Sequence, residues 1–89
     1  NYLLDRNTRF LKRGDKHIKI TEKEMNFIIE LNNSSKPFSK EYILKKIWGY
    51  SSETDTHTIE THIYRLRQKI KKSFEDKDFI KHSKDGYSL

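Results

Sequence analysis

The stretch "DTHTIETHIYRLRQKI", residues 55–70, decides the fold because it places an apolar stripe along one side of a helix. Its aliphatic residues recur four, three and four positions apart, a spacing at which side chains share one helix face. They are Ile59, Ile63, Leu66 and Ile70. Asp55 or Thr56 can cap the amino end. The pattern therefore predicts a long helix over residues 56–73.

The opposite side of this predicted helix is polar and carries no acidic residue. With the apolar stripe at 0° and about 100° of rotation per residue, this side lies between about 140° and 240°. Its residues are His57, Thr61, Tyr64, Arg65, Gln68 and Lys72. Arginine offers a planar pair of donors that matches guanine O6 and N7, and a helix fits the major groove of DNA. The side can meet phosphates and bases; the alternative is a solvated basic face.

The same stretch contains His57, Glu60 and His62, which could also indicate a zinc-binding catalytic helix. Zinc helices place two histidines four residues apart, so that both imidazoles share a face. His57 and His62 are five residues apart. That spacing is about 140° around the helix, so the two side chains cannot both reach one ion without help from elsewhere. No nucleophile–base arrangement or pair of carboxylates can be singled out. We expect no metal, no cofactor and no enzymatic activity.

Two shorter helices are predicted upstream. "TEKEMNFIIEL", residues 21–31, begins with Thr21 and has Glu24 three residues later, the pattern of a capping box. The residues expected on its buried face are Met25, Ile28 and Ile29. "SKEYILKKIWG", residues 39–49, repeats the pattern, with Ser39 as the cap and Gly49 as a left-handed stop. Its residues expected to face inward are Ile43, Leu44 and Ile47.

Strands are predicted on both sides of the helices. Residues 1–20 alternate short apolar groups with turn residues, which indicates strands joined by turns. "DFIKHSKDGYSL", residues 78–89, predicts a strand, a tight turn at residues 84–86 and a return strand. A sheet, three helices over residues 21–73 and a terminal hairpin together define an α+β fold.

Length, charge and composition limit the possible functions. Eighty-nine residues suit a single domain, and a net charge of +6 favours a polyanionic partner, nucleic acid ahead of an anionic membrane. The longest apolar runs have three residues, whereas about 20 are needed to cross a bilayer. The absence of cysteine excludes disulfides and thiolate zinc ligands, and it fits a cytoplasmic setting. Because the chain begins almost inside its first strand, we expect a fragment of a longer protein.

Four motifs, in this order, resemble the OmpR/PhoB-type winged-helix effector domain of bacterial two-component response regulators. They are "KITEKEMNFIIEL", "FSKEYILKKIWGY", "DTHTIETHIYRLRQKI" and the terminal "DGYSL", and they cover about residues 20–89. The resemblance implies a winged helix-turn-helix with an amino-terminal antiparallel sheet, three helices and a carboxy-terminal hairpin wing. In this family the third helix enters the major groove and the wing touches the adjacent groove. The implied function is sequence-specific binding of double-stranded DNA to regulate transcription.

The resemblance also implies roles for individual residues. The implied base readers are Arg65, as the principal reader, with His62, Thr61 and Gln68 nearby. The implied phosphate ligands are Thr58, Tyr64, Arg67, Lys40, Trp48, Lys84 and Tyr87. The family has a loop that can touch RNA polymerase at the position of Tyr50, Ser51, Ser52, Glu53, Thr54 and Asp55. Relatives bind tandem half-sites, and an upstream phosphoacceptor receiver domain served by a sensor kinase is expected.

Two departures from the family pattern stand out. Many relatives carry arginine at the position of Tyr64, so a phosphate contact there is reduced to a hydroxyl. The common wing pattern is Thr-Val-Arg-Gly-x-Gly-Tyr, whereas residues 81–87 read "KHSKDGY" and lack its arginine. Lys84 or Lys81 can replace the charge but not the planar fork of donors. We expect a different operator preference.

Two other functions remain open from the residues alone. A winged-helix interaction module could use the basic face to bind an acidic protein, and dependence on duplex sequence separates this from DNA reading. The helix over residues 56–73 could instead lie on an anionic membrane, although its apolar stripe is needed for the core. Sedimentation with anionic vesicles tests the second alternative.

Overall fold

A three-stranded antiparallel sheet forms the amino-terminal end of the computed structural model, which describes residues 2–51 and 53–89. Its strands are β1 (Leu3–Asp5), β2 (Phe10–Arg13) and β3 (Lys16–Lys19), with β2 in the centre. Leu11 of β2 is buried, and its partners in the register are Leu4 and Ile18. The alternation in the sequence therefore turns one apolar face of the sheet toward the core.

Helix α1 (Glu22–Asn32) begins at the predicted capping box. The Thr21 hydroxyl accepts a hydrogen bond from the Glu24 backbone N–H at 3.1 Å, and Glu24 Oε1 accepts one from the Thr21 N–H at 2.8 Å. These reciprocal bonds satisfy two backbone donors that a helix start would otherwise leave free.

The prediction of which residues form the buried face of α1 was only partly right. Ile28 is buried, but Met25 and Ile29 are half-buried, and the other fully buried apolar residues are Phe27 and Leu31. The face is rotated because α1 packs against three partners, α3, β5 and the second helical segment. The Phe27 ring lies between these partners, 5.9 Å from Trp48 and 6.3 Å from Tyr87 between centroids.

The second helical segment begins as α2 (Lys40–Tyr42) and widens into a π-helical turn, η1 (Ile43–Ile47). The Ser39 side chain caps it as predicted, by accepting from the Tyr42 N–H at 3.2 Å. Gly49 adopts the predicted left-handed conformation with a φ of 68°. The π turn itself was not predicted. Of the three residues expected to face inward, Ile43 and Leu44 are buried and Ile47 is half-buried.

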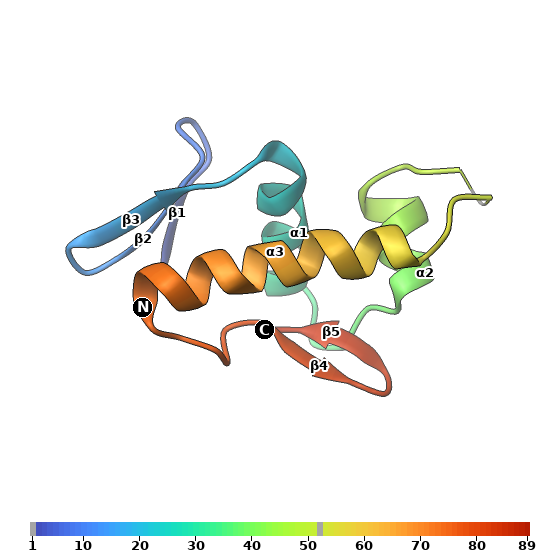
Figure 1. Ribbon diagram of the computed structural model, residues 1–89. Coiled ribbons are helices and arrows are strands. Elements are labelled where there is room, and N and C mark those ends of the chain that lie inside the picture. Colours follow the sequence, from blue (N-terminus) through green and yellow to red (C-terminus); the bar gives the residue numbers. More distant parts are fainter. Residues whose placement is uncertain (1, 52) are drawn as a thin grey trace.

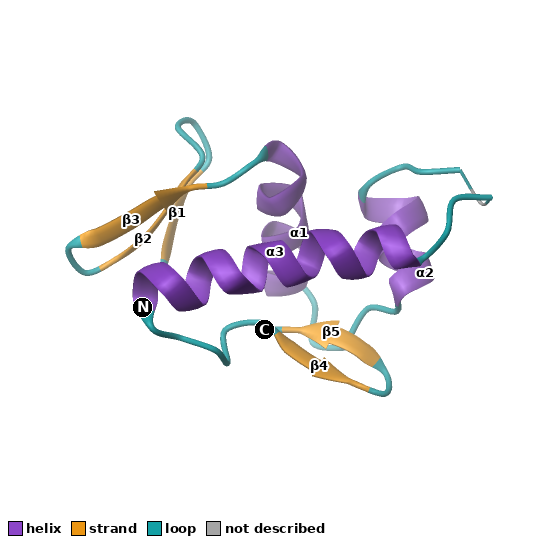
Figure 2. Ribbon diagram, in the orientation of Figure 1, coloured by secondary structure: helices purple, strands orange, loops and turns teal. Residues whose placement is uncertain are grey.

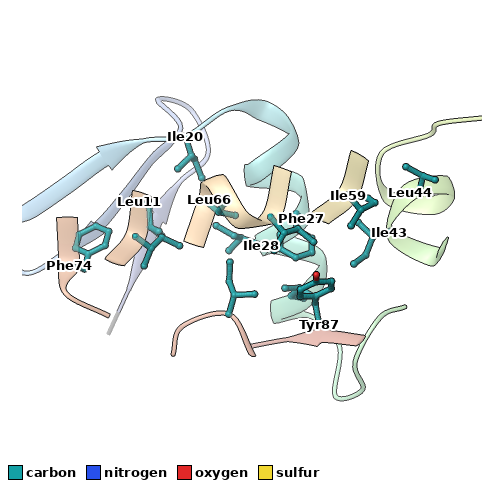
Figure 3. Close-up of a cluster of buried hydrophobic side chains, with 14 residues drawn as sticks. Leu11, Ile20, Phe27, Ile28, Ile43, Leu44, Ile59, Leu66, Phe74 and Tyr87 are labelled. Atoms are coloured by element: carbon teal, nitrogen blue, oxygen red, sulfur yellow. The ribbon is translucent and has the colours of Figure 1, made fainter. Parts of the chain in front are cut away.

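Helix α3 (His57–Phe74) crosses the front of the molecule in Figure 1. All four residues of the predicted stripe are at most 1% exposed, and Phe74 extends the stripe by one turn. Figure 3 shows Ile59 and Leu66 pointing into the cluster that contains Phe27. The N-cap residue is Thr56, whose side chain makes no capping bond, and Asp55 before it accepts from the His57 N–H at 2.9 Å. The helix therefore begins and ends one residue later than predicted.

The terminal hairpin consists of β4 (Lys81–Ser83) and β5 (Gly86–Ser88), and it lies below α3 in Figure 1. Phe38, which precedes α2, and Tyr87 exchange two backbone hydrogen bonds of 2.9 Å. Gly86 makes this approach possible, because its φ is 128° and a Cβ atom would lie 2.1 Å from the Phe38 carbonyl oxygen. Gly86 thus belongs to the return strand rather than only to the predicted turn.

The order of elements in Figure 2 is the predicted one: an antiparallel sheet, three helical segments and a hairpin, an α+β arrangement. In the described ranges, no helix combines the length and the hydrophobicity that a membrane span requires.

Candidate nucleic-acid interface

The outward face of α3 is exposed as the helical wheel predicted. Arg65 and Gln68 are exposed, and Tyr64 retains 63% of its accessible surface. Thr61 is half-buried, and its hydroxyl lies 3.4 Å from the His57 carbonyl oxygen of the preceding turn. The burial of the opposite stripe holds the helix in place, so these side chains project from a fixed backbone.

One flank of α3 carries an ion pair that sequence reasoning missed. The Lys40 ammonium group bonds Glu60 Oε1, while Glu60 Oε2 lies 3.2 Å from His57 Nδ1. The hydrogen bond from Lys40, with that of His57, lowers the pKa of Glu60, and the bond to Glu60 raises the pKa of Lys40. Both partners are therefore charged at neutral pH. A phosphate that binds Lys40 must compete with the Glu60 carboxylate.

Trp48 and His62 form the other flank. Their rings meet edge to face, with centroids 5.2 Å apart. The Trp48 indole N–H donates to the Lys23 carbonyl of α1 at 2.9 Å. An indole has a single hydrogen-bond donor, so the group expected to hold a phosphate is already engaged. Trp48 connects η1 to α1 and supports the half-buried His62 ring.

The same flank contains a second long-range contact that was not predicted. Glu24 is 8% exposed, and its Oε1 accepts from Lys69 of α3 at 2.8 Å as well as from the capping bond with Thr21. One buried carboxylate thus closes the first turn of α1 and ties it to α3. The capping-box pattern identified Glu24 but gave no sign of Lys69, which lies 45 residues away.

The two hairpin residues expected to hold phosphate differ in exposure. Lys84 is exposed in the turn between β4 and β5, whereas Tyr87 is 4% exposed and its ring stacks on His82 at 4.2 Å. Burial, with a smaller effect of the Glu60 carboxylate, raises the pKa of the Tyr87 hydroxyl, and the charges of Lys40 and Arg67 act in the opposite direction. The ring is therefore part of the core, while the hydroxyl lies within electrostatic reach of the basic groups beside α3.

The remaining predicted residues lie around α3. Thr58 and Arg67 are half-buried on its flanks. In the loop expected to touch RNA polymerase, Ser51 and Glu53 are exposed, Thr54 is half-buried, and the Asp55 side chain accepts from the first N–H of α3. Tyr50 lies under the Lys23 ammonium group, and Ser52 lies outside the described residues.

The histidines of α3 face different neighbours. His57 meets Glu60, whereas His62 packs on Trp48. Across residues 2–51 and 53–89, no three histidine or acidic side chains gather as a metal site would require.

Comparison with known sequences shows which family of proteins this chain resembles. A family described as "Transcriptional regulatory protein, C terminal" matches residues 14–89. The probable transcriptional regulator ycf27 of Guillardia theta is 33% identical over 84 residues, which cover 90% of this chain and 33% of the relative. The heme response regulator HssR of Staphylococcus aureus is 37% identical over 73 residues, which cover 81% of this chain and 33% of the relative. The chain thus spans about a third of the length of these curated relatives.

Solved structures show the same fold. The carboxy-terminal domain of NsrR, a nisin resistance regulator, superposes with a TM-score of 0.77 at 29% identity, covering 99% of this chain and 89% of that one. The DNA-binding domain of Bacillus subtilis CssR superposes with a TM-score of 0.74 at 22% identity, covering 99% of this chain and 98% of that one. The family match, together with this fold and the exposed helix, places the chain among winged-helix DNA-binding domains of transcriptional regulators. The chain belongs to the family of OmpR/PhoB-type carboxy-terminal effector domains.

Proposed function

We propose that the outward face of α3 enters the major groove of double-stranded DNA and reads base sequence. Arg65 is the principal reader, because its exposed guanidinium can bond guanine O6 and N7 at once. His62, Thr61 and Gln68 lie nearby and contribute to the preference. The observation that carries this proposal is an exposed face without acidic residues, held rigidly by a stripe that is fully buried behind it.

Phosphate contacts on the flanks of α3 position the domain and carry no sequence information. We assign them to Thr58, Tyr64, Arg67 and the Tyr87 hydroxyl, together with the hairpin over residues 78–89, where Lys84 provides a point charge at the adjacent groove. Lys40 joins them by exchanging Glu60 for a phosphate. Trp48 acts here by supporting His62, because its indole N–H is bonded to α1.

Residues 1–89 form one DNA-binding domain in this proposal, and it is the effector part of a cytoplasmic response regulator. A phosphoacceptor receiver domain precedes it and a sensor kinase controls that domain. The support is the name of the relative HssR, a response regulator about three times as long as the matched segment. Residues 50–55 offer a contact for RNA polymerase.

Two copies bind tandem half-sites about 10 bp apart, one turn of the double helix. Selection from random duplexes, followed by footprinting at two salt concentrations, tests this function. We expect a repeated half-site and an affinity that falls steeply with salt, because lysine and arginine displace counterions from phosphates. A single unrepeated half-site overturns the tandem arrangement. Equal affinity for every DNA sequence overturns base reading and favours the alternative that the outward face of α3 is a basic surface without sequence preference.

A further inference from the structure

A groove beside the base-reading face is lined by two of the proposed base readers, His62 and Arg65, but the residues that α1 contributes to it have no role in the function proposed above. Its walls come from the first turn of α1, the end of η1 and one flank of α3. The charged residues and the histidine that line the groove are Glu22, Lys23, Glu24, His62, Arg65 and Lys69. In the proposed docking, one backbone of the major groove lies on the hairpin side of α3. We propose that the groove described here binds the other backbone, with Lys23 as the phosphate ligand. The inference rests on the proposed docking of α3 in the major groove.

The position of the groove follows from the arrangement around α3. In Figure 1 the amino end of α1 lies on one side of α3 and the hairpin lies on the other. The major groove is bounded by two sugar–phosphate backbones, so a helix inside it presents one flank to each. Arg65 belongs both to the outward face and to the wall of the groove. Docking of Arg65 on a base therefore brings the nearer backbone over this groove.

Lys23 is the lysine of the groove whose charge remains available for a phosphate, since Arg65 is assigned to a base in the proposed function. Its ammonium group lies 4.4 Å from the centroid of the Tyr50 ring, and a cation–π contact of this kind orients the side chain without neutralising it. Across the described ranges, Lys23 forms no ion pair. Lys69, by contrast, is committed to Glu24. A lysine ammonium binds phosphate as a point charge, which suits a contact with the backbone rather than with a base.

Two carboxylates also line the groove, and they differ in their effect. Glu24 is 8% exposed and already accepts from Lys69 and from the Thr21 N–H, so its charge is balanced within the protein. Glu22 is exposed and would repel a phosphate bound by Lys23. The inference thus predicts opposite effects for two neighbouring residues. Removing the Lys23 charge weakens DNA binding, and removing the Glu22 charge strengthens it.

The first test is fluorescence anisotropy of the selected duplex and a scrambled one, titrated with wild type, Lys23→Ala and Glu22→Gln over a range of salt concentrations. Lys23→Ala should weaken binding to both duplexes about three- to tenfold and reduce the salt slope by about 0.9. Glu22→Gln should strengthen both about twofold. The controls are Lys16→Ala on β3 and Glu30→Gln at the far end of α1, which make the same charge changes away from the groove and should change affinity less than twofold.

Lys23→Ala keeps the backbone carbonyl that accepts from Trp48, so folding should be unaffected, and circular dichroism checks this. If the Lys23→Ala protein is folded and binds DNA with the same affinity as wild type, the proposed groove site is wrong. If wild type still prefers the selected duplex in that case, the proposed function stands. If wild type shows no preference at all, base reading fails independently of the groove.

A second test locates the contact. Single phosphates of the selected duplex are replaced in turn by neutral methylphosphonates, and each duplex is titrated with wild type and Lys23→Ala. At one position or two adjacent positions, on the strand opposite the wing contacts, wild type should lose affinity about three- to tenfold and the variant should lose almost none. Equal losses for both proteins at every position would mean that Lys23 touches no phosphate, which overturns the inference.

Discussion

The buried and outward faces of α3 come from the same 18 residues but serve different purposes. The four aliphatic residues of the stripe are at most 1% exposed and join the sheet, α1 and the hairpin around one core. Tyr64 on the outward face keeps 63% of its surface and takes no part in that core. In the proposed function, stability and DNA reading therefore depend on separate side chains of one helix. Substitutions should be able to change one property without the other.

The largest expected effect is on the buried face. Leu66→Ala removes a fully buried side chain and leaves a cavity, so the free energy of unfolding should fall by about 2 to 5 kcal/mol. Urea denaturation followed by circular dichroism measures the loss. Gln68→Ala, on the outward face two residues later, is the matched control and should change stability by about 0.5 kcal/mol or less. Similar losses for the two variants would contradict the division between the faces.

Gly86 extends the comparison of buried and exposed residues to the hairpin, because it is buried next to the exposed turn residues Lys84 and Asp85. Gly86→Ala should lower the free energy of unfolding by roughly 2 kcal/mol, because φ is 128° and the new Cβ would overlap the Phe38 carbonyl. Gly49→Ala shares a positive φ but meets open space, so it should cost about 1 kcal/mol. Thermal unfolding of both variants checks the order. A larger cost at Gly49 would show that the contact with Phe38 is unimportant.

Arg65→Ala tests the outward face. Affinity for the selected duplex should fall by about 1 to 3 kcal/mol while the free energy of unfolding stays within about 0.5 kcal/mol of wild type. Anisotropy and urea denaturation measure the two quantities. A destabilised Arg65→Ala protein would mean that the outward face also supports the fold.

The pH dependence of stability probes the contact between the end of α3 and the sheet. Asp76 accepts from the Tyr2 hydroxyl at 2.7 Å, and this bond, with the Asp78 N–H, lowers the pKa of Asp76. A carboxyl group whose pKa is lowered by folding stabilises the protein above its unfolded pKa of about 4, and this stabilisation is lost as pH falls through the folded value. Asp76→Asn should cost about 1 kcal/mol at pH 7 and little at pH 2. Urea denaturation at both pH values measures this, and an equal loss at both would contradict a role for the charge.

The smallest effect is expected at Glu60. Glu60→Gln should release Lys40 for phosphate and strengthen binding to selected and scrambled duplexes alike, by about twofold or less. Anisotropy measures both affinities, and Glu75→Gln beyond the end of α3 is a matched control. A gain confined to the selected duplex would indicate that Glu60 acts on a base rather than on Lys40.

Sequence alone predicted those features whose causes are local. The stripe of α3 was predicted from its spacing, and the caps at Thr21 and Ser39 from patterns of three or four residues. The family model and the solved relatives confirm the winged-helix class that the four motifs indicated. Such features depend on neighbours within one or two helical turns, so a single sequence contains them.

The missed features depend on packing between distant segments. The bonds from Lys40 to Glu60, from Trp48 to the Lys23 carbonyl and from Lys69 to Glu24 span 20, 25 and 45 residues. The rotation of the buried face of α1 has the same origin. These contacts change the candidate site: they engage the donor of Trp48 and give Lys40 a competitor. The base and phosphate contacts themselves remain predictions.

The most direct test of base reading removes an acceptor from the DNA instead of a side chain from the protein. In the selected duplex, each guanine in turn is replaced by 7-deazaguanine, which lacks N7, and the affinities of wild type and Arg65→Ala are measured. Wild type should lose affinity at one guanine of each half-site, by about 1 to 3 kcal/mol, and Arg65→Ala should be insensitive there. If wild type tolerates the change at every guanine, or if both proteins lose the same affinity, Arg65 does not read guanine from the outward face of α3.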